Sequence, residues 1–138
     1  MKRFWIWVAA LAVLVAACSS SATTPEPLAL SLKASDIKFD QTTLEVTSGQ
    51  PVKLTLTNTG VLEHDFNITE IPVSDVKQSG GDAGHSVHAT NTADLHLAVK
   101  AGEMATLEFT PTTSGTYAFE CTVIGHKELG MVGQLIVK

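Results

Sequence analysis

The chain has few basic side chains: 9 Lys and Arg stand against 14 Asp and Glu, which gives a formal net charge of −5. Proteins that bind nucleic acid need clusters of Lys and Arg to neutralise phosphates, so the composition argues against a nucleic-acid partner. An acidic surface suits a basic partner and makes that association sensitive to salt. Acidic composition is also common, and solubility alone explains it.

Residues 1–17 are predicted to form an export signal that is not part of the folded domain. Met1-Lys2-Arg3 is a short basic segment, and residues 4–17 form an almost unbroken apolar run. This run is too short and wrongly flanked for a stable spanning helix. Both tryptophans, Trp5 and Trp7, lie inside it, so the mature protein would contain none.

The end of this signal is similar to the bacterial lipobox. Val15-Ala16-Ala17-Cys18 fits a signal whose cleavage leaves Cys18 as a diacylated N-terminus; the alternative is an ordinary secretory signal that happens to contain a cysteine. Residues 18–27 are small, polar and proline-containing, as expected of a flexible tether, which favours lipidation. The predicted location is a lipid anchor on the outer face of the cytoplasmic membrane, or in the periplasm or outer membrane, of a bacterium.

Cysteine is scarce, and the scarcity is informative. The chain has two cysteines, Cys18 and Cys121, so lipidation of Cys18 would leave Cys121 as the only thiol of the mature protein. An internal disulfide is then impossible, in a compartment where thiols tend to be oxidised. A lone exported cysteine is paired between molecules, buried and inert, or protected by a metal.

No long helical period occurs after the leader; short alternating segments with turn signals between them predict strands. The pattern indicates one all-β domain at 28–138, an antiparallel Greek-key β-sandwich or barrel of about seven or eight strands. The stretch 73–93 shows no such alternation and is predicted to be a long irregular loop, whose role the sequence leaves open. The expected strands are 28–33, 37–39, 44–46, 52–57, 64–69, 104–110, 116–121 and 134–137.

One loop near the C-terminus gathers three metal donors. Cys121, His126 and Met131 are each separated by four residues. Alternation along the preceding strand points Cys121 inward, where burial raises the pKa of a thiol unless a metal stabilises the thiolate. Glycines at 125 and 130 suit the tight bends that would return the other two donors to the same point. A second histidine would complete the His2Cys set with a weak axial Met that is typical of blue-copper centres.

Four histidines are candidates for this second nitrogen donor. His64 has the strongest local case, because it follows a turn and opens a strand at what would be one end of the sandwich. His85 and His88 lie in the Gly- and Ser-rich stretch and are more simply explained as solvated surface, although the pair could bind an adventitious ion. His96 stands opposite the apolar positions of its segment and is expected to be an exposed strand residue.

The sequence resembles the cupredoxins, the blue-copper proteins that include plastocyanin, azurin, auracyanin and rusticyanin. The resemblance covers most of the mature chain, and its specific parts are the residues 63–66, 115–121 and the loop through 133. By this resemblance the ligands of a single type 1 copper ion are His64, Cys121, His126 and axial Met131. The spacing of the loop is more similar to that of rusticyanin-type and small bacterial lipoprotein members than to that of plastocyanin.

The chain departs from the family pattern at two positions. Asp65 stands where many relatives have an asparagine that braces the ligand loops, and a carboxylate accepts hydrogen bonds but cannot donate them. Ile124 stands where many relatives have a proline, two residues before the loop histidine. Groups around the ligands tune a metal site, so these departures leave its reduction potential open.

The resemblance implies a monomeric electron carrier, not an enzyme, that exchanges single electrons with membrane-associated redox proteins. In the family the electrons leave through the edge of the C-terminal histidine, here His126, with Val123, Ile124 and either Leu129 or Leu62 around it. The alternative is a copper-handling module for storage, delivery or resistance, which His85 and His88 mildly favour. An enzyme such as a copper nitrite reductase needs a second copper between domains, and one domain does not supply it.

Overall fold

The computed structural model describes residues 25–81 and 94–138. The predicted export signal at 1–17, Cys18 and most of the tether at 18–27 lie outside the described residues, as do His85 and His88. Within the described residues no helix is long and apolar enough to span a membrane.

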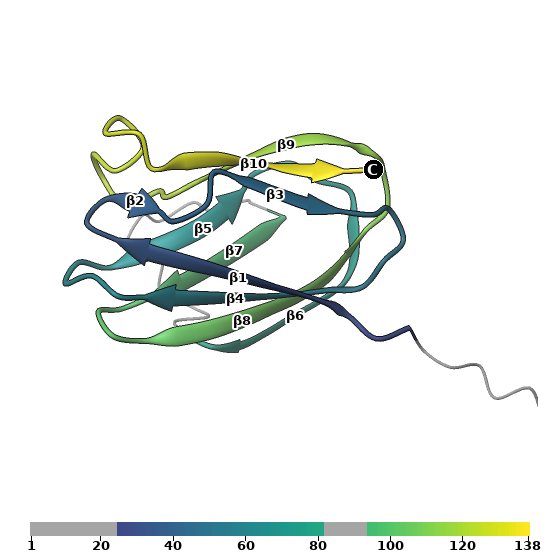
Figure 1. Cartoon of the computed structure of the whole chain (residues 1–138), viewed down its shortest axis with the longest axis horizontal. Coiled ribbons are helices and arrows are strands. Elements are labelled where there is room, and N and C mark those ends of the chain that lie inside the picture. The colour runs from purple at the N-terminus through teal and green to yellow at the C-terminus, as the bar shows by residue number, and fades with distance from the viewer. Residues whose placement is uncertain (1–24, 82–93) are drawn as a thin grey trace, which may run out of the picture.

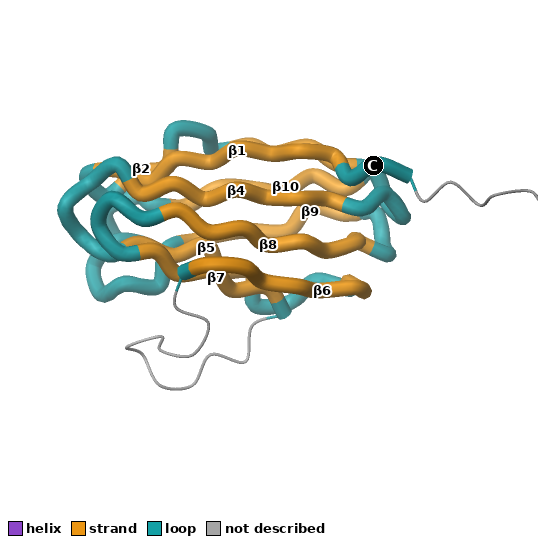
Figure 2. The backbone as a smooth tube through the Cα atoms, turned by 90° about the horizontal axis from the view of Figure 1, so that it is seen from below, coloured by secondary structure: helices purple, strands orange, loops and turns teal. Residues whose placement is uncertain are grey.

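The described chain forms two sheets of five strands each, packed face to face (Figures 1 and 2). This confirms the predicted β-sandwich. The described residues contain ten strands, and one of them, Val73–Gly80, falls in the stretch that was predicted to be irregular. One sheet has the order β2-β1-β4-β8-β6 and the other the order β3-β10-β9-β5-β7. The strands are β1 Leu28–Ser35, β2 Lys38–Phe39, β3 Thr43–Val46, β4 Val52–Asn58, β5 His64–Ile68, β6 Val73–Gly80, β7 Leu95–Val99, β8 Met104–Pro111, β9 Gly115–Glu120 and β10 Val132–Val137.

Two strand pairs are parallel, where only antiparallel pairs were predicted. β1 pairs with β4 in parallel, with Leu28 opposite Val52, and β3 pairs with β10 in parallel. Between β1 and β4 the chain crosses to the other sheet to form β3, so β4 returns beside β1 in the same direction. Alternation of apolar residues gives the faces of a strand and carries no information about its direction.

The prediction that 73–93 is irregular is wrong for its first part, because Val73–Gly80 forms β6. β6 is the edge strand of its sheet, and six of its eight residues are exposed. An exposed edge strand needs no buried face, so it lacks the alternation from which strands are recognised. Its pairing with β8 is also shifted between Ser74 and Lys77, and Asp75 there has a φ of 56°.

The core between the sheets is built from alternate residues of each strand, and aromatic rings fill the end of the core that is nearest to Cys121. Phe119 is fully buried and packs on Phe39 and Phe66, at ring-centroid distances of 5.3 and 5.1 Å. Gly133 lies directly opposite Phe119 in the β9–β10 ladder, and its missing side chain leaves the space that the ring occupies. Phe119 belongs to β9, the strand that leads to Cys121, so the packing of its ring holds that strand in place.

Candidate metal centre

Three donor atoms from two distant segments meet at one end of the sandwich. Cys121 follows β9 directly and is fully buried, as predicted from the alternation, while His64 is the first residue of β5 and is also fully buried. Cys121 Sγ lies 3.3 Å from His126 Nδ1 and 4.0 Å from His64 Nδ1. Among the described residues these three form a group whose donor atoms all lie within 4.8 Å of one another.

The C-terminal loop closes on itself through main-chain hydrogen bonds. The N–H of Cys121 donates to the carbonyl of Met131, and the N–H of Met131 donates to the carbonyl of His126, each at 3.0 Å. Gly125 and Gly130 have φ of 84° and 96°, a left-handed backbone that glycine adopts without steric cost. Met131 is fully buried and is tied to the backbone of Cys121, on the loop that carries the other two donors.

The loop before His64 is held by Asn58, a residue that the sequence analysis did not single out. Asn58 is buried, and its Nδ2 donates to the carbonyls of Leu62 and Val99 at 2.7 and 3.2 Å. Its Oδ1 accepts the N–H of Gly60 at 2.9 Å. The amide therefore fixes both the turn and the approach of the chain to His64. The only sequence signal was an Asn-x-Gly turn, which is common in loops.

Asp65 links the two ligand segments, and the prediction that His96 is exposed is wrong. The Asp65 carboxylate accepts hydrogen bonds from the N–H of Thr122 at 2.6 Å and from the Thr122 hydroxyl, and His96 Nε2 lies 3.3 Å from its Oδ2. The His96 side chain is only 19% exposed. Burial raises the pKa of Asp65, but the hydrogen bonds from His96 and Thr122 outweigh it and lower the pKa below its usual value.

The electrostatics of the site suit a bound cation. Burial raises the pKa of the Cys121 thiol to about 12, so a thiolate there needs a positive partner at neutral pH. Burial and the nearby His126 lower the pKa of His64, which favours the neutral imidazole that binds metals. His64 Nε2 is buried without a hydrogen-bond partner, while its Nδ1 faces the sulfur. One soft sulfur and two imidazole nitrogens fit copper.

The raised pKa of Cys121 predicts that the metal-free protein loses stability in alkali. The folded thiol holds its proton up to about pH 12, while its ordinary pKa is 9.0. Its contribution is therefore complete below pH 9 and is lost as the pH rises toward 12. Urea unfolding under reducing conditions, at pH 8 to 11, should show the free energy of unfolding falling more steeply in the wild type than in Cys121→Ser. Parallel curves for the two proteins would contradict the prediction.

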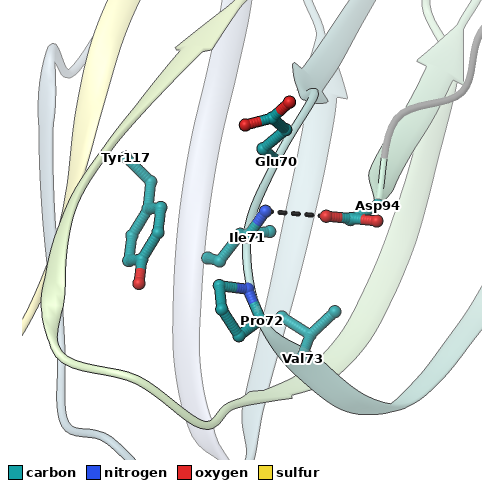
Figure 3. Close-up of a pocket in the computed structure, with 6 residues that line it drawn as sticks. All are labelled: Glu70, Ile71, Pro72, Val73, Asp94 and Tyr117. Carbon is teal, nitrogen blue, oxygen red and sulfur yellow. Dashed lines mark hydrogen bonds between the residues drawn. The ribbon is translucent and has the colours of Figure 1, made fainter.

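A pocket on another part of the surface is lined by side chains of a different kind from these donors. A pocket of about 560 Å³ is lined by Glu70, Ile71, Pro72, Val73, Asp94 and Tyr117 (Figure 3). The Asp94 carboxylate is already used by the N–H of Ile71, at 2.7 Å. The lining contains no thiol, thioether or imidazole, so the pocket lacks the soft donors that copper prefers.

Known proteins share this fold and about a quarter to a third of the aligned sequence. Auracyanin-A of Chloroflexus aurantiacus is 27% identical over 148 residues, which covers 93% of this chain and 91% of that protein. A copper-resistant cuproprotein, CopI, of Rubrivivax gelatinosus is 30% identical over 103 residues, but the chain spans only 61% of its length. The solved structure of auracyanin A, titled a "blue" copper protein, matches with a TM-score of 0.63 and 24% identity over 82% of this chain and all of that one.

A family pattern covers nearly the whole described chain. The pattern described as "Copper binding proteins, plastocyanin/azurin family" matches residues 27–138, which include His64, Cys121, His126 and Met131. The two histidine nitrogens and the thiol that converge in the structure lie within this match. The chain therefore belongs to the plastocyanin/azurin family of copper-binding proteins.

Proposed function

We propose that this protein carries single electrons, with His64, Cys121, His126 and Met131 as the ligands of one type 1 copper ion. The observation that carries the proposal is the convergence of two Nδ1 atoms and one Sγ in a buried site. Copper supplies a one-electron couple because both Cu(I) and Cu(II) tolerate such a ligand set. The sandwich supports this chemistry by holding the donors through the main-chain bonds of the C-terminal loop and the side chain of Asn58.

The surface around the ligand loops fits a brief encounter with a redox partner. Val61, Leu62, Ile124 and Leu129 are exposed by 85, 47, 80 and 69%, and they flank His64 and His126 in sequence. His126 itself is only 5% exposed, so a partner would have to dock closely over its edge. Small apolar contacts with a polar rim suit weak, transient electron-transfer complexes. Val123, predicted to be part of this surface, is partly buried and also packs against the core.

A copper-handling role is the second candidate, and the similarity to the copper-resistant cuproprotein CopI favours it. A storage or delivery protein must exchange its ion, whereas a carrier must retain it in both oxidation states. The complete burial of Cys121 and His64 favours retention. An enzymatic role is not proposed, because the family to which the chain belongs is described as copper-binding proteins and the converging donors suit a single ion.

The spectrum and redox behaviour of the copper-loaded protein test the proposed function. We expect the intense visible absorption of a Cu(II)–thiolate bond, an EPR signal of type 1 copper and reversible one-electron cycling without loss of metal. A colourless protein that gives up Cu(I) to a competing chelator within seconds would support the copper-handling role instead.

We further propose that Cys18 is lipidated and that the protein works as a monomer, tethered outside the cytoplasmic membrane of a bacterium. The lipobox-like Val15-Ala16-Ala17-Cys18 and the polar segment after it support this. A tether raises the effective concentration of membrane-bound redox partners. Expression of wild type and Cys18→Ser in a bacterial host should place the wild type in the membrane fraction and release the exported variant into the soluble fraction. Equal partitioning of the two proteins would contradict lipidation.

A further inference from the structure

The strand that supplies His64 also carries a buried carboxylate. All five residues of β5 are buried, and Asp65 lies on the face opposite Phe66 because side chains alternate along a strand. The Asp65 side chain is only 6% exposed. A buried carboxylate is strongly unfavourable unless hydrogen-bond donors surround it, so the groups that contact it decide how it is held.

His96 reaches this carboxylate from the neighbouring strand. Asp65 is opposite Ala98 in the antiparallel β5–β7 pair, so His96 is its diagonal neighbour on the same face. Nε2 of His96 lies 3.3 Å from Oδ2. The same carboxylate accepts hydrogen bonds from the N–H and the hydroxyl of Thr122, and an ionised carboxylate can only accept. The hydrogen bond between His96 and Asp65 therefore requires the tautomer that has its proton on Nε2, which acts as the donor.

Asp65 contacts the thiol segment through both its backbone and its side chain. Its N–H points to Cys121 Sγ at 3.5 Å, and its carboxylate binds the N–H and the hydroxyl of Thr122, the next residue. A movement of the carboxylate would therefore shift the main chain of Asp65 against the sulfur. Hydrogen bonds around the cysteine sulfur and support of the ligands both tune a copper site.

We propose that His96 is a positioning residue of the metal centre: its Nε2–H holds the Asp65 carboxylate against Thr122 and so fixes the Asp65 N–H at the Cys121 sulfur. The proposal rests on the proposed function in one respect, namely that Cys121 is a copper ligand. The polar Nε2–H of His96 also offsets part of the negative charge of the Asp65 carboxylate, which lies next to the site. Loss of this donor leaves more negative charge there, which favours the oxidised, more highly charged ion and lowers the reduction potential.

The test compares His96→Leu, which removes the donor, with His96→Gln, which retains one. In the metal-free protein, exchange of the Thr122 amide hydrogen should become about tenfold faster in the leucine variant, the effect of one charge-assisted hydrogen bond. In the copper-loaded protein, the leucine variant should have a lower reduction potential, with the ratio of Cu(I) to Cu(II) affinity reduced by roughly the same factor. The glutamine variant should lie near the wild type in both measurements.

The same substitution made in the Asp65→Asn variant distinguishes positioning through Asp65 from a general loss of stability. In Asp65→Asn the carboxylate charge is absent, so a further His96→Leu change should shift the potential much less than it does in the wild type. An unchanged potential and amide exchange in His96→Leu, or an equal shift in the Asp65→Asn background, would overturn the proposal. If the wild-type protein forms no blue centre, the proposed function fails, while the metal-free exchange still decides whether His96 holds the loop.

Discussion

Replacing His64 with alanine is expected to abolish the intense visible absorption of the copper-loaded protein. His64 supplies one of three converging donors, with its Nδ1 4.0 Å from Cys121 Sγ. Without it one sulfur and one nitrogen of the three converging donors would remain, and the His2Cys set that is typical of a blue-copper centre would be incomplete. Titration of the metal-free variant with Cu(II), followed by visible and EPR spectroscopy, measures the loss.

His96→Ala tests whether the ligand has been assigned to the right histidine. His96 lies on the adjacent strand and reaches the site only through the Asp65 carboxylate, so its removal should leave the absorption band in place even where the potential changes. Loss of colour in His96→Ala, with colour kept in His64→Ala, would mean that the ligand has been assigned to the wrong histidine.

Replacing Gly133 with alanine is expected to destabilise the protein by about 3 kcal/mol, the upper part of the range for overpacked cores. A Cβ at this position would overlap Cζ and Cε2 of the Phe119 ring. The ring cannot move away easily, because Phe119 is fully buried between Phe39 and Phe66. Thermal unfolding followed by circular dichroism should show a melting temperature lower by roughly 10 °C or more.

Two further variants show whether the overlap with Phe119 is the cause. Gln134→Ala changes the next residue of β10, which is exposed, and should be close to neutral. Phe119→Leu replaces the ring with a smaller side chain and should lower the stability by itself. Combined with Gly133→Ala, the total loss of stability should be smaller than the sum of the two single losses, because the smaller side chain removes the overlap. A Gly133→Ala protein as stable as Gln134→Ala would contradict the packing argument.

The meeting of Cys121 and His126 was predictable from the sequence because their chemistry and their spacing are local. Cys121, His126 and Met131 lie on one short loop, and alternation along Tyr117 and Phe119 was enough to point the cysteine inward. His64 was harder, since four histidines competed; its place at the start of a strand favoured it, and the family resemblance then selected it. Spacing within a loop constrains which donors meet, whereas pairing between distant segments depends on topology.

The residues that hold the ligands in place, and the pairing of the strands, were much less predictable from the sequence. Asn58 and His96 act through hydrogen bonds to residues that are 41 and 31 positions away in the chain. The periodic pattern of apolar residues does not indicate such pairs. The parallel pairs β1–β4 and β3–β10 were missed because alternation carries no direction, and β6 because an exposed edge strand buries no face. The contacts of Asn58 and His96 and the two parallel pairs join segments far apart in the chain, which a local pattern does not encode.

Both ends of the described chain lie at the end of the sandwich opposite the ligand loops (Figure 1). β1 runs from Leu28 toward the metal end, and β10 runs from Val132, beside the ligand loop, away to Val137. At about 3.3 Å per residue, the eight residues of β1 alone span roughly 23 Å in the direction of the metal end. A second protein fused at either end, or an electrode attached there, would therefore leave the metal end facing outward and open to partners in solution.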